Sequence, residues 1–395
     1  MERPDPAPAG EVPARRLLLF AGMFSAYLLS SGFKNTEYNN YVLLADAWLH
    51  GHIWLASQIP GIDTLFYHGH WYVIEAPLPA VLVLPLVVVF GLQANQVLVG
   101  AVCAAVAVCA ADALFERMGL DSRTQRWMLA FFAFGTVLWW CTAFGAVWMF
   151  AHVAGAMFAL LMLAECYGRG RPWLIGLLLA CAALCRFPIG FALFPVLYWF
   201  YTSRRLTWRA LWSFCVAALP LLVAYAAYNY ARWHTFADIG YTLWYHQDEV
   251  GMPTGSPFRL QYLPFDLYSM FMLPPQYVNH FPWLHPTSFG VALTFTSPAL
   301  ALALATPLRE REGFTWWTAA ALTALPSLFY YVNGFEQFGM RHSLDFTPFL
   351  LPLVARGFAR FPGGVARCLI VLSVCANAYG LWYSWQYHAF TVVPR

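Results

Sequence analysis

The residues best suited to chemistry are concentrated in one stretch after the first apolar segment. Between Lys34 and Pro77 lie four carboxylates, Glu37, Asp46, Asp63 and Glu75, and two histidine pairs, His50/His52 and His68/His70. Ionisable groups held beside a bilayer are costly to keep, which makes them candidates for a functional site. Carboxylates of this kind can take a proton from a reacting hydroxyl or bind polar groups of a substrate. We therefore expect chemistry at a membrane surface.

The composition indicates the class of protein that must position these residues. Of 395 residues, 61% are hydrophobic and 10% are charged, and the mean hydropathy is +0.56. A chain of this kind cannot be a soluble globule, so we predict an all-α polytopic membrane protein. The sequence has no glycine-rich phosphate loop and no basic stripe with interleaved aromatics, which excludes a nucleotide site of those kinds and a nucleic-acid partner. All nine cysteines fall in predicted spans, so no disulfide framework is expected.

Apolar segments near the length needed to cross about 30 Å of hydrocarbon predict eleven transmembrane helices. They are Leu17–Phe33, Val97–Leu114, Trp127–Phe144, Val147–Tyr167, Trp173–Cys185, Phe187–Tyr201, Leu211–Tyr230, Ser288–Pro307, Trp316–Val332, Leu344–Val354 and Val365–Trp385. The segment Leu78–Gly91 is short and holds two prolines, so we interpret it as a re-entrant or surface-lying helix. The prediction is a single transmembrane domain over 1–395, with a cytoplasmic tail at 1–16, a first outer loop with juxtamembrane helices at 34–92 and a long outer loop at 231–287.

The distribution of charge predicts the orientation. Cytoplasmic loops are enriched in Lys and Arg, and the predicted inner segments hold 16 of the 22 basic residues. The same arrangement sends the first-loop acids and all eleven histidines to the other side. We expect a cytoplasmic N-terminus and an active site on the exoplasmic face. An enzyme working there without a nucleotide site needs an activated substrate displayed in the membrane, and a polyprenyl-phosphate sugar is the usual one.

Four sequence blocks resemble the outer motifs of one enzyme family. They are Thr36-Glu37-Tyr38 leading into Tyr41…Asp46…Gly51; Asp63…Gly69-His-Trp-Tyr72…Glu75-Ala-Pro77; Asn229-Tyr230 with Phe236-Ala-Asp238-Ile-Gly240-Tyr241; and Phe338-Gly339-Met-Arg341-His342…Asp345-Phe-Thr-Pro348. Together they resemble the GT-C fold glycosyltransferases, polytopic enzymes that include protein O-mannosyltransferases and the aminoarabinose transferase that acts on lipid A. Where relatives carry an Asp-Glu pair, this chain has Thr36-Glu37.

The resemblance implies a bacterial inner-membrane enzyme that moves a sugar, with inversion, from a polyprenyl-phosphate donor to a hydroxyl of a lipid, glycan or protein acceptor. Such a reaction needs a carboxylate base and a fixed cation for the departing phosphate, and a guanidinium suits phosphate well. The predicted catalytic base is Glu37, with Asp46 second. The predicted phosphate ligands are Arg341, Arg186 and His342. The predicted substrate-binding residues are Asp63, Tyr72, Glu75, Asp238 and Tyr241.

Several alternatives stay open from the sequence. Asp46 has an alternative role as a solvated residue of a surface helix, and Arg186 and Arg341 as interfacial anchors. No cofactor follows from the sequence, although a divalent metal ion bound by the histidine pairs is an alternative. Because the two histidines of each pair are spaced i, i+2, the backbone would have to be extended for both to bind the same ion. We expect the long outer loop to cover the first loop and shape the acceptor site, with Asp238, Tyr241, His246 and Asp248 as contacts. The competing functions are a transporter or lipid flippase, which usually shows internal repeats and midplane charges, and a non-enzymatic scaffold.

Overall fold

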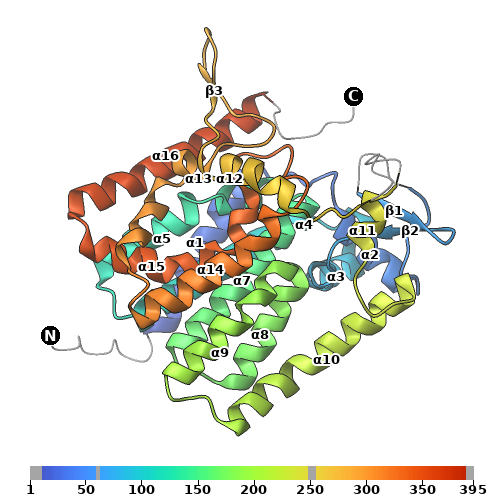
Figure 1. Cartoon of the computed structure of the whole chain (residues 1–395). Coiled ribbons are helices and arrows are strands. Elements are labelled where there is room, and N and C mark those ends of the chain that lie inside the picture. Colours follow the sequence, from blue (N-terminus) through green and yellow to red (C-terminus); the bar gives the residue numbers. More distant parts are fainter. Residues whose placement is uncertain (1–10, 59–62, 248–254, 388–395) are drawn as a thin grey trace.

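The fold is a bundle of helices with two small β-hairpins outside it (Figure 1). The computed structural model describes residues 11–58, 63–247 and 255–387. The main helices of the bundle are α1 (Glu11–Ser30), α4 (Gln96–Arg117), α5 (Ser122–Phe134), α6 (Leu138–Phe144), α7 (Val147–Tyr167), α8 (Pro172–Cys185), α9 (Leu193–Thr202), α10 (Trp208–Trp233), α14 (Arg311–Leu328), α15 (Thr347–Arg360) and α16 (Gly363–Tyr387). Helix α7 lies at the centre, where 17 of its 21 residues are buried.

Each predicted apolar segment overlaps a helix, and Val147–Tyr167 coincides with α7. Within the described residues, α4, α7, α10 and α16 are each long and apolar enough to cross a membrane, and α5 with α6 makes a fifth candidate that bends by 44°. The remaining apolar helices are shorter, including α3 (Leu78–Phe90), for which we predicted a re-entrant or surface position. The count of eleven spans therefore stays a prediction.

Arginines of the predicted inner loops meet at one end of the bundle. Arg311 donates to the carbonyl of Thr202 at 3.3 Å, and Arg360 pairs with Glu310 at 2.7 Å. On the same predicted side, Arg15 of α1 pairs with the buried Asp112 of α4 at 2.7 Å. These contacts link several short connections of the predicted inner surface to neighbouring helices. Which side of a membrane it faces stays a prediction.

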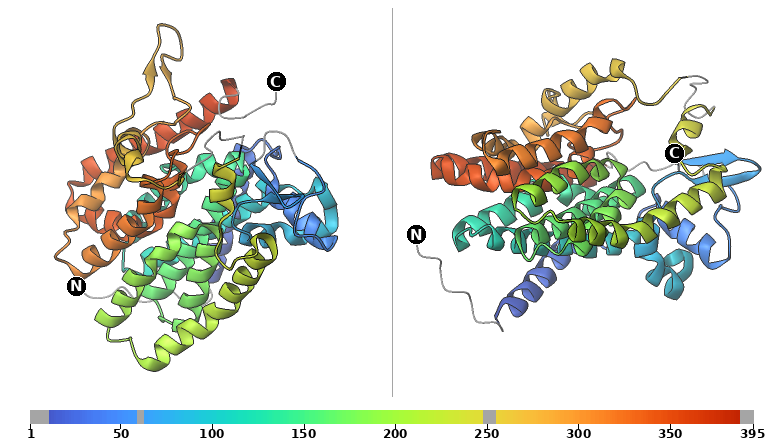
Figure 2. Two further views of the ribbon diagram at one scale, coloured as in Figure 1. Left: turned by 45° about the vertical axis from the view of Figure 1, so that its right-hand side comes forward. Right: turned by 60° about the horizontal axis from the view of Figure 1, so that its bottom comes forward.

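The first predicted outer loop folds against the start of the long one. After α2 (Asn40–Leu49), strands β1 (Thr64–Tyr67) and β2 (His70–Val73) pair antiparallel. The turn between them has positive φ at His68 (48°) and Gly69 (85°), as a two-residue hairpin turn requires. Aromatic and aliphatic side chains of the hairpin pack on Trp233 and on α11 (Gly240–Tyr245). Figures 1 and 2 show α2, α3, α11 and this hairpin gathered at one end of the molecule.

The rest of the long loop runs along another edge of the bundle (Figure 1). It contains η3 (Leu260–Tyr262), α12 (Leu263–Phe271) and a second hairpin, β3 (Gln276–Tyr277) with β4 (Leu284–His285). The chain re-enters the bundle through α13 (Leu293–Thr296) and the 3-10 helix η4 (Pro298–Ala305). The hairpin projects away from the body beside the end of α16 (Figures 1 and 2).

Candidate functional site

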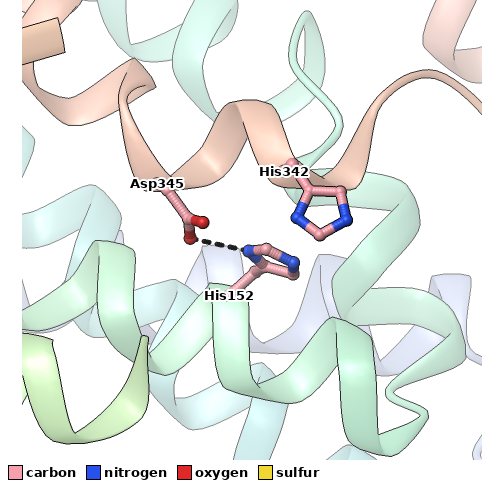
Figure 3. Close-up of side chains that lie close together, drawn as sticks. All are labelled: His152, His342 and Asp345. Carbon is pink, nitrogen blue, oxygen red and sulfur yellow. Dashed lines mark hydrogen bonds and ion pairs between the residues drawn. The ribbon is translucent and has the colours of Figure 1, made fainter. Parts of the chain in front are cut away.

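A buried group of four polar side chains lies where α7, the end of α8 and the 3-10 helix η5 (Arg341–Asp345) meet. Asp345 accepts from His152 Nδ1 at 2.8 Å, from Arg186 Nε at 3.2 Å and from Arg186 Nη2 at 3.0 Å. The second histidine, His342, lies beside Arg186, with 3.1 Å between Nη2 and Nδ1. Figure 3 shows His342 and Asp345 on one turn of chain, with His152 reaching Asp345 from a separate helix.

Breaks in the helices place these residues. Helix α8 ends at Cys185, and Arg186 has an extended backbone before Phe187-Pro188, where a continuing helix would lack an amide donor. On the other side, Pro348 lies in the first turn of α15, so the chain before it forms η5 instead of a longer α-helix. Both breaks turn a charged side chain into the protein interior.

The same cluster is the one group of metal-ligand type within the described ranges, because atoms of His152, His342 and Asp345 lie within 4.8 Å of one another. Arg186 already gives Asp345 two hydrogen bonds and neutralises its charge. A divalent cation would have to displace this guanidinium, so the arrangement does not fit a metal ion. The histidines of the first loop make other contacts: His70 stacks on Trp54 with 4.3 Å between ring centroids, His52 packs on the same ring in a tilted arrangement at 5.0 Å, and His50 lies beside Asp46.

Arg341 is a second buried guanidinium, and it has no ion-pair partner among the residues that the structure describes. Its Nη1 donates to the carbonyl of Phe335 at 2.9 Å, while its buried Nε has no hydrogen-bond partner there. Its guanidinium lies 6.0 Å from the ring centre of Trp148. A buried cation in this state is poised to bind an anion, because an unpaired charge away from water is costly.

Asp63 lies beside this cation. Its Oδ2 accepts from Trp148 Nε1 at 2.8 Å, and its charge acts on Arg341, which is close enough for the two to attract without forming an ion pair. The side chain of Asp63 is partly exposed. Of the four carboxylates in the first loop, Asp63 is therefore the one placed between solvent and a buried arginine.

Glu75 is the innermost first-loop acid, with 3% of its surface exposed. Asn40 Nδ2 donates to its Oε1 at 3.5 Å, and its Oε2 has no partner within the described part of the chain. Burial, reinforced by repulsion from Asp63, raises the pKa of Glu75 from 4.5 to about 8. At neutral pH Glu75 is therefore mostly a neutral acid that can donate a hydrogen bond.

Two tyrosines and a third arginine surround Glu75. Tyr41 and Tyr241 are close enough that the negative charge of Glu75 adds to the effect of burial in raising their pKa values. Arg232, at the end of α10, is 1% exposed and donates to the carbonyl of Val73 at 3.1 Å. Its guanidinium lies over the rings of Tyr228 and Trp233. The hairpin strand that leads to Glu75 is thus fixed to α10 by a buried cation.

Two other predicted site residues, Glu37 and Asp46, lie farther out. Glu37 is exposed, and Asp46, a quarter exposed, faces the exposed His50. Tyr72 is buried against Trp233, with 5.1 Å between ring centroids.

In the long loop, Asp238 accepts from Tyr225 and from the amide of Gly240, an arrangement that holds the start of α11. His246 Nε2 forms a hydrogen bond with the carbonyl oxygen of Gly255 at 2.6 Å, and Asp248 lies outside the described residues.

The sequence reasoning did not select His152, Trp148 or Arg232 as site residues, and it named Asp345 only within a motif. One usable signal was present: His152 is an ionisable residue inside an apolar span, which is rare without a function. Asp345 and Arg186 are 159 positions apart, so their pairing required the fold.

Comparison with known proteins identifies the fold of the chain. No family model and no curated protein sequence matches the chain. Among solved structures, it is similar to ArnT from Cupriavidus metallidurans, solved bound to undecaprenyl phosphate, with a TM-score of 0.55 and 14% sequence identity. The similarity covers 89% of this chain. The chain has a GT-C fold. It spans 61% of the length of that ArnT chain, so at this identity the shared GT-C fold is what the match establishes.

Proposed function

We propose that the protein is an integral membrane glycosyltransferase of a bacterial inner membrane, and that it moves a sugar from a polyprenyl-phosphate donor to an acceptor hydroxyl at the exoplasmic face. The observation that carries this proposal is that Arg341, a buried guanidinium without a carboxylate partner in the described residues, lies within electrostatic reach of the Asp63 carboxylate. The bound undecaprenyl phosphate of the structurally similar ArnT supports a lipid-phosphate donor.

In the proposed reaction, the acceptor oxygen bonds to the anomeric carbon while the bond from that carbon to the phosphate oxygen breaks. The acceptor proton goes to a carboxylate, and the electron pair leaves with the phosphate. Attack from the face opposite the phosphate would invert the anomeric carbon, as the resemblance implies. Arg341 would stabilise the phosphate, because guanidinium donors match phosphate oxygens and stay charged in a buried site.

Arg186 and His342 would have a secondary part in binding the phosphate, beside Arg341. Arg186 is already paired with Asp345, and burial and the neighbouring charges lower the pKa of His342 well below its usual value, so that it stays neutral. Their predicted contact with phosphate would therefore rest on donors that Asp345 leaves unused.

Four first-loop acids compete for the role of base, and the contacts favour Asp63 over the earlier choices Glu37 and Asp46. A base must lie within hydrogen-bond reach of the proton that it takes. Asp63 lies beside Arg341 and Trp148, whereas Glu37 is exposed and Asp46 faces His50. Glu75 and Tyr241 would bind sugar hydroxyls, with Glu75 as a donor.

The test is turnover by the purified full chain in lipid vesicles, given a panel of polyprenyl-phosphate sugars and acceptors, with release of polyprenyl phosphate as the readout. Asp63→Asn should lower turnover by roughly 10²–10⁴-fold, the usual worth of a general base. Glu37→Gln and Asp46→Asn are matched neutral replacements in the same loop, and a collapse in either instead of Asp63→Asn would return the role to that residue.

The phosphate assignment has its own comparison. Arg341→Gln should weaken turnover strongly, and Arg341→Lys should restore part of it, because lysine keeps the charge and loses the paired donors. Arg209→Gln, an exposed change on the predicted inner side, should have no effect. Movement of lipid-linked sugar across the vesicle bilayer without release of polyprenyl phosphate would contradict the proposal and support a flippase.

A further inference from the structure

A groove between the outer ends of α1 and α16 has a cation at its rim. Its volume is about 480 Å³, within the range of small-molecule sites. It is lined by the end of α1, the turn that follows it and the last turns of α16, with the residues Leu29, Ser30, Gly32, Lys34, Ala378, Leu381, Trp382 and Trp385. None of them belongs to the group around Arg341 and Asp63.

Lys34 is the single lysine of the chain. Its Nζ lies 4.9 Å from the ring centre of Trp385, and its side chain is exposed. Among the described residues, no carboxylate lies within ion-pair distance of it. The protein therefore presents an uncompensated positive charge beside an aromatic face and an apolar groove.

The backbone is built to hold Lys34 there. Gly32 and Phe33 both have positive φ, 59° and 57°, and the amide of Lys34 bonds back to the carbonyl of Ser31 at 3.2 Å. Phenylalanine in this conformation is strained, and such strain persists where the surrounding structure requires it. The tight turn directs the residue after the apolar run back toward α16.

The floor of the groove is also fixed. Trp385 Nε1 donates to the carbonyl of Ser30 at 3.0 Å, and its ring packs on Phe144 of α6 with 4.8 Å between centroids. Trp139 Nε1 donates to the hydroxyl of Ser30 at 2.9 Å. At the mouth, Leu29 is 66% exposed and Trp382 is 39% exposed. A rigid aromatic floor with an apolar mouth suits a hydrocarbon chain.

We propose that this groove binds an anionic phospholipid of the outer leaflet, with an acyl chain along Leu29, Leu381 and Trp382 and the phosphate at Lys34. Two features support that occupant. The cation follows directly after the apolar run that ends at Phe33, which is the level where hydrocarbon gives way to headgroups. A lone cation near a membrane surface attracts anionic lipid, and each such charge is worth a severalfold gain in binding.

The experiment is native mass spectrometry of the full chain in a neutral detergent, titrated with phosphatidylglycerol or, as a zwitterionic control, phosphatidylcholine. Lys34→Gln should reduce retention of phosphatidylglycerol by roughly fivefold, and Lys34→Arg should preserve it. Arg367→Gln removes a partly exposed cation near the other end of α16 and should leave retention unchanged. Ala378→Trp fills the groove without touching the charge and should also reduce retention.

The single lysine gives a second measurement on the unaltered protein. An amine-reactive reagent can modify only Lys34 and the N-terminal amine, so peptide mapping reports on Lys34 alone. Phosphatidylglycerol should slow modification of Lys34, and phosphatidylcholine should not. Equal lipid retention by wild type and Lys34→Gln would overturn the proposal. Protection by polyprenyl phosphate in place of phosphatidylglycerol would also overturn it and assign the groove to the sugar carrier.

Discussion

Replacing Glu75 with Gln should stabilise the protein by an amount that grows with pH. The carboxyl is 3% exposed, and burial raises its pKa from 4.5 to about 8. Below pH 4.5 the acid is protonated in the folded and the unfolded chain, so the substitution removes no charge effect. Between pH 4.5 and about 8 the unfolded chain releases the proton and the folded chain keeps it, which favours unfolding.

The size of the effect follows from the same values. One pKa unit corresponds to about 1.4 kcal/mol, so the folded state loses about 1.4 kcal/mol per pH unit inside this window. From pH 5.5 to 7.5 the advantage of Glu75→Gln should therefore grow by about 3 kcal/mol, and it should level off above about pH 8. The amide keeps an oxygen for the 3.5 Å contact with Asn40.

The assay is thermal unfolding in detergent across that pH range, scored as the difference in Tm between variant and wild type. Glu37→Gln makes the same chemical change at an exposed position and serves as the matched control. A Tm difference for Glu75→Gln that stays flat from pH 5.5 to 7.5 would refute the reasoning, because it would mean that Glu75 is ionised in the folded state over the whole window.

Two further substitutions test the packing of the bundle. Asp345→Asn leaves Arg186 without its counter-charge and should destabilise the protein by about 3–5 kcal/mol. Adding Arg186→Gln to that variant should recover part of the lost stability, and thermal unfolding of both variants measures the difference. Gly357→Ala would bring a Cβ within 1.8 Å of the carbonyl oxygen of Leu302 and should cost about 1–3 kcal/mol, whereas Gly22→Ala meets nothing within 4 Å and should be neutral in the same denaturation assay.

The helices were predictable because the sequence signal is local. Apolar length alone predicts Val147–Tyr167, and the interruption Arg186-Phe187-Pro188 predicts the end of α8. The bend between α5 and α6 was not predicted, because Trp127–Phe144 contains no proline and no charged residue. It depends on close packing at Gly135, where a Cβ would lie 3.0 Å from Ser373 of α16.

The sequence could name candidate residue types for the site, and their roles and ranking stay predictions. Proximity to the first span favoured Glu37, but the first loop folds back through a hairpin that brings Asp63 and Glu75 inward. The pairing of Arg186 with Asp345 joins positions 159 apart, and one sequence gives no signal for such a contact. Only the three-dimensional structure shows that Arg186 has a carboxylate partner and that Arg341 has none among the described residues.

Helix α10 connects the predicted inner surface to the hairpin, yet only 11% of its apolar window is buried, and it packs mainly on α8. Its far end carries Arg232, whose bond to the carbonyl of Val73 fixes the strand before Glu75. A helix that faces lipid along most of its length adjusts its tilt to the thickness of the hydrocarbon layer. A change in bilayer thickness should therefore shift the position of Glu75 through α10 and Arg232, so that the placement of this side chain would depend on the acyl-chain length of the membrane.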